Sequence, residues 1–100
     1  MDFHTESDYV NHYCTQWNGK IEYRLLDRTR VDCLTENKAI EFDWCKKWAE
    51  GIGQALYYSK VTGKAPTVAL ICKTSEQRFV NRVLVAAPEI EIIIIPNETP

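Results

Sequence analysis

The sequence lacks the features that mark several classes of protein. No apolar run approaches the roughly 20 residues that a membrane-spanning helix needs. The first residues contain neither a basic segment nor the apolar core of a signal peptide. No repeat, linker or low-complexity stretch divides the 100 residues, a length that suits one ordinary domain. We therefore expect a single cytosolic domain over residues 1–100, with a loose tail only at residues 97–100.

Zinc-binding and disulfide patterns are also missing, although the chain has four cysteines. Their spacing provides no CxxC pair and no zinc motif. Because 45% of the residues are hydrophobic, the chain has enough apolar content to build a core without disulfides. We expect reduced, mostly buried thiols in a reducing compartment. These cysteines are Cys14, Cys33, Cys45 and Cys72.

An excess of basic residues is missing as well, since the formal net charge is −2. A basic surface is the usual mark of non-specific DNA binding, so this charge argues mildly against it. It does not exclude nucleic acid as a partner. Acidic metal ligands lower the total charge of a protein while basic groups elsewhere act locally.

Hydrophobic periodicity and turn residues predict an α/β domain with a mixed central sheet between helices. Thr5 has the position of an N-cap before an acidic first turn. Thr74, followed three residues later by Gln77, resembles a capping box. The expected order is helix, three-stranded meander, helix, strand, helix, strand. The helices are expected at residues 5–18, 46–61 and 74–87, and the strands at residues 20–27, 29–35, 38–44, 67–72 and 90–95.

The hairpin formed by the second and third strands carries four charged residues on one face. If its turn lies at residues 36–37, paired residues have numbers that sum to 73. Asp32 then faces Glu41, and Arg30 faces Asp43. Two carboxylates directly opposite each other repel, and a divalent cation such as Mg²⁺ or Mn²⁺ would offset that repulsion. The same pattern also fits an amphipathic hairpin with a solvated charged face.

One stripe of the following helix contains a lysine, a glycine, a glutamine and a tyrosine. At about 100° per residue, Lys47, Gly51, Gln54 and Tyr58 fall beside the apolar face. Gly51 and Gly53 each cost about 1 kcal/mol inside a helix, which suggests close approach of a backbone or a ligand. The alternative is a packing glycine beside an interfacial tyrosine.

Three segments together resemble the PD-(D/E)XK nuclease superfamily, and within it small bacterial and phage nuclease-like proteins. They are residues 30–32, residues 40–43 and residues 54–58. Gln54 and Tyr58 match the QxxxY helix motif of the exonuclease branch. The expected order of elements is similar to the restriction-endonuclease-like core of that superfamily, so the resemblance covers nearly the whole chain.

The resemblance implies a role for each matched residue. Asp32 and Glu41 match the two metal-binding carboxylates, and Gln54 and Tyr58 would position the metal-bound water or the nucleic-acid backbone. Glu6 matches the glutamate that the first helix often supplies. The alternative for Glu6 is a first-turn acid that interacts with the helix dipole.

The chain departs from the motif at one position, where Asp43 stands in place of the lysine. The lysine of this superfamily can migrate to the following helix, so Lys47 is the candidate and Lys46 the fallback. In that arrangement Lys47 would stabilise the negative charge of the transition state. Arg30 would hold Asp43 beside the metal through an ion pair across the strands.

We therefore expect a nuclease that uses Mg²⁺ or Mn²⁺ to hydrolyse phosphodiester bonds, with DNA as the expected substrate. The first alternative is a catalytically inactive module of the same fold that binds nucleic acid or protein, which Asp43 and the net charge favour. The second is a structural subunit that needs a partner for activity. A homodimer is a further expectation, because residues 90–95 are expected to form a strand edge that needs cover.

Overall fold

The elements follow one another in the predicted order. The computed structural model describes residues 2–100, and all elements lie within that range. None of the helices in that range is both long enough and apolar enough to cross a membrane. The helices are α1 (Glu6–Gln16), α2 (Trp48–Thr62) and α3 (Gln77–Ala86), and the strands are β1 (Lys20–Arg24), β2 (Arg30–Leu34), β3 (Lys38–Trp44), β4 (Ala65–Cys72) and β5 (Glu91–Pro96).

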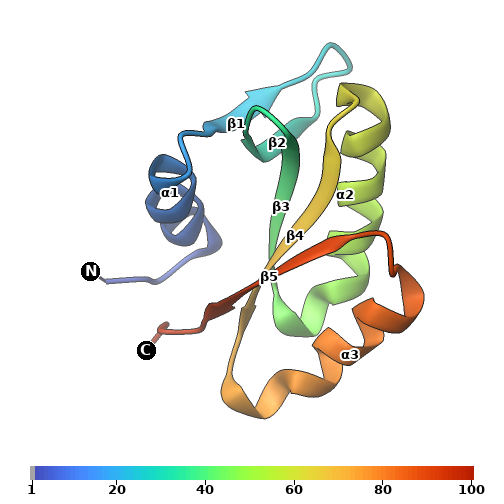
Figure 1. Cartoon of the computed structure of the whole chain (residues 1–100). Helices are drawn as coiled ribbons and strands as arrows, with labels where there is room; N and C mark the ends of the chain where they lie inside the picture. The colour runs from blue at the N-terminus through green and yellow to red at the C-terminus, as the bar shows by residue number, and fades with distance from the viewer. Residues whose placement is uncertain (1) are drawn as a thin grey trace.

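The five strands form one mixed sheet in the order β1-β2-β3-β4-β5. The first three strands are an antiparallel meander, while β3, β4 and β5 run parallel. A parallel neighbour needs a crossover connection, and α2 and α3 supply the two that are required. Figure 1 shows α1 on one face of the sheet and both crossover helices on the other. The prediction of a mixed sheet flanked by helices is confirmed at this level.

Two apolar layers form because β3 and β4 are covered on both faces. Helix α1 contributes Tyr9, Val10 and Cys14 to the first layer, where they pack against Ile40 and other residues of the sheet. The second layer lies under α2 and α3. Its buried members are Cys45, Ala55, Val68, Leu70, Cys72, Val80, Val83, Ala87 and Ile90.

The predicted N-cap of α1 is confirmed, whereas the predicted start of α3 is wrong. The Thr5 N–H donates to Asp8 Oδ2 (3.0 Å) and the Asp8 N–H donates to Thr5 Oγ1 (3.4 Å), a reciprocal cap. Before α3, residues 74–76 form a 3₁₀ turn instead of helix. Glu76 Oε1 accepts the Lys73 N–H (2.7 Å), so the cap lies one residue earlier than the sequence pattern indicates.

Residues 97–99, predicted to be a loose tail, are attached to α1. The Tyr9 hydroxyl lies 2.8 Å from Thr99 Oγ1 and accepts the Glu98 N–H at 2.9 Å. The Asn97 N–H donates to the Cys72 carbonyl (2.9 Å), which extends the pairing between β4 and β5. The bonds to Tyr9 join residues about ninety positions apart, which no local pattern reveals.

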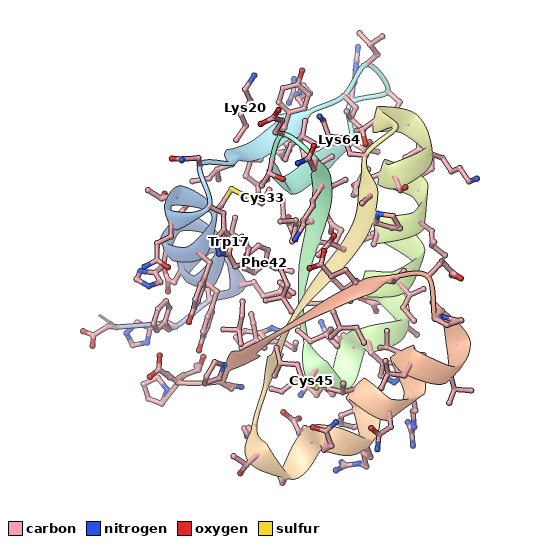
Figure 2. All side chains as sticks on the ribbon, viewed as in Figure 1. Trp17, Lys20, Cys33, Phe42, Cys45 and Lys64 are labelled. Atoms are coloured by element: carbon pink, nitrogen blue, oxygen red, sulfur yellow. A yellow bond between two sulfur atoms is a disulfide. The ribbon has the colours of Figure 1, made fainter. Side chains whose placement is uncertain are left out.

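The expectation of reduced thiols is wrong, since the four cysteines form two disulfides. Cys14 of α1 joins Cys33 of β2, with their Cα atoms 5.7 Å apart. Cys45 joins Cys72 with a Cα separation of 4.9 Å. Figure 2 shows Cys33 beside α1 and Cys45 at the opposite end of the sheet. Disulfides are rare in the cytosol, so the cytosolic location stays a prediction without support.

A substitution at Gly19 tests the packing around the first disulfide. A Cβ at Gly19 would lie 2.4 Å from Cys33 Sγ and 2.6 Å from Cys14 Sγ. We expect Gly19→Ala to lower the free energy of unfolding by about 1–3 kcal/mol, because neither sulfur can move freely. Urea denaturation under oxidising conditions measures the change.

Gly53→Ala is the matched control, since a Cβ there meets nothing within 4 Å and Gly53 lies inside α2. Alanine should raise the free energy of unfolding by up to about 1 kcal/mol through its helix propensity. Equal effects of the two substitutions would contradict the close packing at Gly19.

Candidate functional site

The site begins where β2 and β3 stop pairing. The pairs Cys33–Ile40 and Leu34–Ala39 have the predicted register, which places Asp32 opposite Glu41. At that point the carboxylates of Asp32 and Glu41 accept hydrogen bonds from backbone N–H groups, in place of the backbone carbonyls of a regular strand pair. Asp32 Oδ2 accepts the Phe42 N–H (2.9 Å), and Glu41 Oε1 accepts the Asp32 N–H (3.1 Å). Each side chain is therefore held by the backbone of the opposite strand.

Four carboxylates from three elements gather near this point. Glu41 and Asp43 are only 4% and 6% exposed, although both are acidic. Asp32 is half-buried, and its carboxyl group lies beside that of Glu41. Glu6 reaches the group from the first turn of α1, where its carboxyl group lies beside that of Asp43. Its Oε1 atom is buried and has no hydrogen-bond partner.

Burial and mutual repulsion make the ionised carboxylates unfavourable. Burial is the main cause that raises the pKa of Asp32, Glu41 and Asp43. The charge of Asp32 raises the pKa of Glu41 further, and Glu6 does the same for Asp43. Neither ion pair found within residues 2–100 involves any of these four residues. No ion pair within residues 2–100 therefore offsets the charge that these carboxylates carry when ionised.

Helix α2 closes the site on the side of the sheet opposite α1. A Cβ added at Gly51 would lie 3.5 Å from Asp43 Cβ and 3.7 Å from Asp43 Oδ2, so the helix backbone packs directly over that carboxylate. The close approach predicted from glycine thus occurs at Gly51 but not at Gly53. Tyr58, two turns later, is buried, and its pKa is raised by burial and by the charge of Glu41.

Two predicted residues of the α2 stripe make no recorded contact with the carboxylates. Gln54 is exposed and forms no hydrogen bond within the described chain. Lys47 is exposed in the 3₁₀ turn after β3 (Cys45–Lys47), where it lines a different hollow. Within residues 2–100, no contact therefore places a lysine beside the carboxylates, where the motif has one.

The predicted ion pair between Arg30 and Asp43 is wrong. Arg30 Nε instead lies 3.9 Å from Glu22 Oε2, and both side chains are about half exposed. The reason is that β2 leaves β3 at Asp32 but remains paired with β1 as far as Arg24 opposite Arg30. Arg30 therefore belongs to the outer edge of the sheet, away from the buried Asp43.

The donor set fits a hard divalent cation in its chemistry. Carboxylate oxygens are the ligands that Mg²⁺ and Mn²⁺ prefer, and Asp32 and Glu41 each use only one oxygen for a backbone N–H. The buried, unpartnered Glu6 Oε1 points to a missing positive group. As they stand, no three acidic, histidine or cysteine side chains of residues 2–100 are spaced to hold a metal ion. Binding would therefore require the carboxylates to turn toward a common point.

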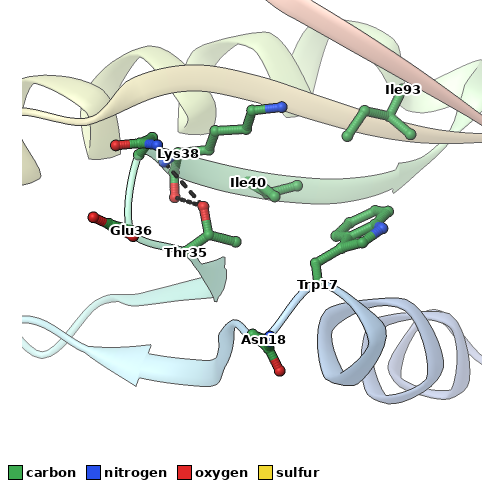
Figure 3. A pocket seen from close by; sticks show the side chains of 8 residues that line it. Trp17, Asn18, Thr35, Glu36, Lys38, Ile40 and Ile93 are labelled. Carbon is green, nitrogen blue, oxygen red and sulfur yellow. Dashed lines mark hydrogen bonds between the residues drawn. The ribbon is translucent and has the colours of Figure 1, made fainter.

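Sequence reasoning missed the hollows that lie outside this group, two of which are described here. The larger, of about 600 Å³, lies between α1, the β2–β3 turn and β5, where Figure 3 shows Trp17, Ile40 and Ile93 lining it. The smaller, of about 330 Å³, is lined in part by Lys46, Lys47 and Lys73. One feature of the sequence could have indicated the smaller hollow: these lysines follow the ends of two strands that are parallel in the sheet.

Comparison of the chain with models of protein families, with curated proteins and with solved structures finds no match. The resemblance to PD-(D/E)XK nucleases thus stays a prediction from three short segments of sequence. What the structure shows is the coarser statement: an α/β domain with a five-stranded mixed sheet and three helices.

The raised pKa values predict how stability depends on pH. In the unfolded chain these carboxylates ionise near pH 4. Above that pH the native protein binds more protons than the unfolded chain, so the free energy of unfolding should fall as the pH rises from about 5 to about 8. Glu41→Gln should make this fall shallower, because it removes one of the groups. Urea denaturation at several pH values, in EDTA, measures both slopes.

Glu89→Gln provides the control, since Glu89 is exposed and lies in the turn before β5. Its slope should equal that of the unmodified protein. An unmodified protein whose stability rises over this range, or an unchanged slope in Glu41→Gln, would contradict the burial of ionisable carboxyls at this site.

Proposed function

We propose that this chain is a metal-dependent nuclease that hydrolyses phosphodiester bonds of nucleic acid, with DNA as the expected substrate. The observation that carries the proposal is the pairing of buried carboxyl groups, Asp32 with Glu41 and Glu6 with Asp43, none of which forms an ion pair within residues 2–100. Buried like charges are costly unless they are protonated or bind a cation. A divalent cation would neutralise them, and a bound divalent cation is able to catalyse the hydrolysis of a phosphodiester at neutral pH.

Asp32 and Glu41 are the proposed metal ligands. Their reciprocal bonds to backbone N–H groups keep both side chains at the point where the strands separate. Asp43 and Glu6 lie at the other end of the group and would bind the ion or its water. When bound, Mg²⁺ or Mn²⁺ would polarise the phosphate and lower the pKa of a water molecule.

The remaining residues would act on the substrate. Tyr58 lies close enough to Glu41 for its pKa to respond to that charge, so its hydroxyl is suited to orient a water or a phosphate oxygen. Lys47 is proposed to stabilise negative charge in the transition state, which requires its exposed side chain to turn toward the carboxylates. Gln54 is proposed to contact the nucleic-acid backbone from the exposed side of α2.

A second candidate function is a catalytically inactive module that binds nucleic acid or protein. Asp43 stands where the motif has lysine, and its carboxylate is buried against α2 without a positive partner. A metal-binding domain without that lysine would retain binding and lose turnover. A homodimer stays a further prediction for either function, resting on β5 as an edge strand whose Ile94 is 52% exposed.

The first test of the proposal is metal binding. We expect isothermal titration calorimetry to show Mn²⁺ binding to the unmodified protein and none to the double variant Asp32→Ala/Glu41→Ala, because the variant loses both ligands. Glu89→Gln, which removes a carboxylate outside the group, should bind as the unmodified protein does. If the double variant binds Mn²⁺ equally well, the assigned site is wrong.

The second test is cleavage of labelled DNA and RNA, single-stranded and duplex, with Mg²⁺ or Mn²⁺. We expect Lys47→Ala to lower kcat about 100-fold with little change in KM, the signature of a group that acts on transition-state charge. Lys60→Ala removes an exposed lysine from the last turn of α2 and should leave kcat unchanged. Metal binding without cleavage of any substrate would favour the inactive module.

A further inference from the structure

The end of the hairpin formed by β1 and β2, called the hairpin tip below and comprising residues 24–30, is positively charged. Its three arginines, Arg24, Arg28 and Arg30, are all exposed, and with one aspartate they give the tip a formal charge of +2. Arg24 and Arg28 form no ion pair within residues 2–100. Arg30 has Glu22 as its partner, at 3.9 Å and with both side chains about half exposed. The tip is therefore positive in a chain whose net charge is −2.

The arginines stand at positions that the local structure disfavours. Arg24 lies directly opposite Arg30 in the strand pair, and like charges in that position repel. Arg28 is the last residue of a three-residue loop, which is closed by bonds from the Arg28 N–H to the Leu25 carbonyl (3.0 Å) and from the Leu25 N–H to the Thr29 carbonyl (2.8 Å). Its φ of 73° is the left-handed conformation that usually requires glycine there. Neighbouring departures from local rules that all add positive charge point to a binding role.

A single apolar side chain lies between these arginines. Leu26 is fully exposed at the first position of the loop. Figure 1 shows this loop at the edge of the molecule, at the opposite end from α3. One leucine provides too little apolar surface to hold a protein in a membrane. A leucine beside basic groups is suited to contact bases in a groove of DNA, where apolar side chains act as wedges.

The hairpin tip is held in place by its one acidic residue. Asp27 Oδ1 accepts the Thr29 N–H (3.0 Å), and Asp27 Oδ2 accepts a hydrogen bond from the Tyr57 hydroxyl of α2. The loop is thus fixed both within itself and to a helix. A surface that is ordered before binding loses less conformational entropy when it binds.

We propose that the hairpin tip binds duplex DNA, with Arg24 and Arg28 on backbone phosphates and Leu26 against the bases of a groove. A groove of the duplex admits a two-stranded ribbon, and closely spaced phosphates engage several arginines at once, as a single small anion does not. The inference goes beyond the proposed nuclease and does not rest on it, because it requires neither a metal ion nor a phosphate at the carboxylate group.

Fluorescence anisotropy with a labelled DNA duplex, at several salt concentrations in EDTA, tests the proposal without metal-dependent cleavage. We expect Arg28→Gly to weaken binding about fivefold and to reduce the salt slope by about 0.9, as the loss of one phosphate contact does. Arg28→Lys should retain the slope. Leu26→Ser should weaken binding and leave the slope unchanged, because no charge is lost.

Two measurements separate binding from folding and from charge in general. Arg28→Gly should not lower the urea midpoint, since glycine suits the left-handed position. Weaker binding by this variant is therefore not a result of unfolding. Arg82→Gln is the matched control, because it removes an exposed arginine from α3, at the other end of the molecule. Its affinity and salt slope should equal those of the unmodified protein.

Each remaining outcome decides for or against the hairpin tip. Equal binding by Arg28→Gly and Arg82→Gln, or no binding of DNA at low salt, would overturn the inference, even if cleavage is found with Mg²⁺. Binding that depends on Arg28 in a protein that cleaves nothing would retain the inference and overturn the nuclease. Arg28-dependent binding to vesicles that contain phosphatidylserine, with none to DNA, would assign the tip to a membrane surface and overturn the proposal.

Discussion

The exchange of hydrogen bonds between Asp32 and Glu41 and the backbone of the opposite strand governs the arrangement of this domain. Asp32 Oδ2 accepts from the Phe42 N–H, and Glu41 Oε1 accepts from the Asp32 N–H. Because these carboxylates take the place of ladder carbonyls, β2 separates from β3 at this point while remaining paired with β1. The separation lets the first turn of α1 bring Glu6 to Asp43, and it leaves buried acids grouped between the two helical layers.

This grouping opposes folding unless something compensates for it. Burial, with the charge of nearby carboxylates, raises the pKa of Asp32, Glu41 and Asp43, so the native protein keeps protons that these groups lose in the unfolded chain. Structural ion pairs would have provided basic partners, yet the arginine nearest in sequence, Arg30, pairs with Glu22 instead. A site whose charge remains unbalanced within the described chain is more suited to a ligand than to stability.

Opposite charges lie on the two sides of Trp44. Glu41 and Asp43 lie before it on β3, and Lys46 and Lys47 lie after it in the turn that leads to α2. The segment is attached to β4, because Cys45 is bonded to Cys72.

Local rules were sufficient for the elements of the fold, and they failed where contacts join distant parts of the chain. Alternation and helical periodicity determine the order of elements, the Thr5 cap and the register of Cys33 with Ile40, since each depends on residues a few positions apart. The opposition of Asp32 and Glu41 was predictable for the same reason. Four other features were not predictable from local patterns: the partner of Arg30, the two disulfides, the attachment of residues 97–99, and the placement of Lys73 near Lys46. These depend on where β2 leaves β3 and on how the crossovers bring strand ends together, and only packing of the whole chain decides both.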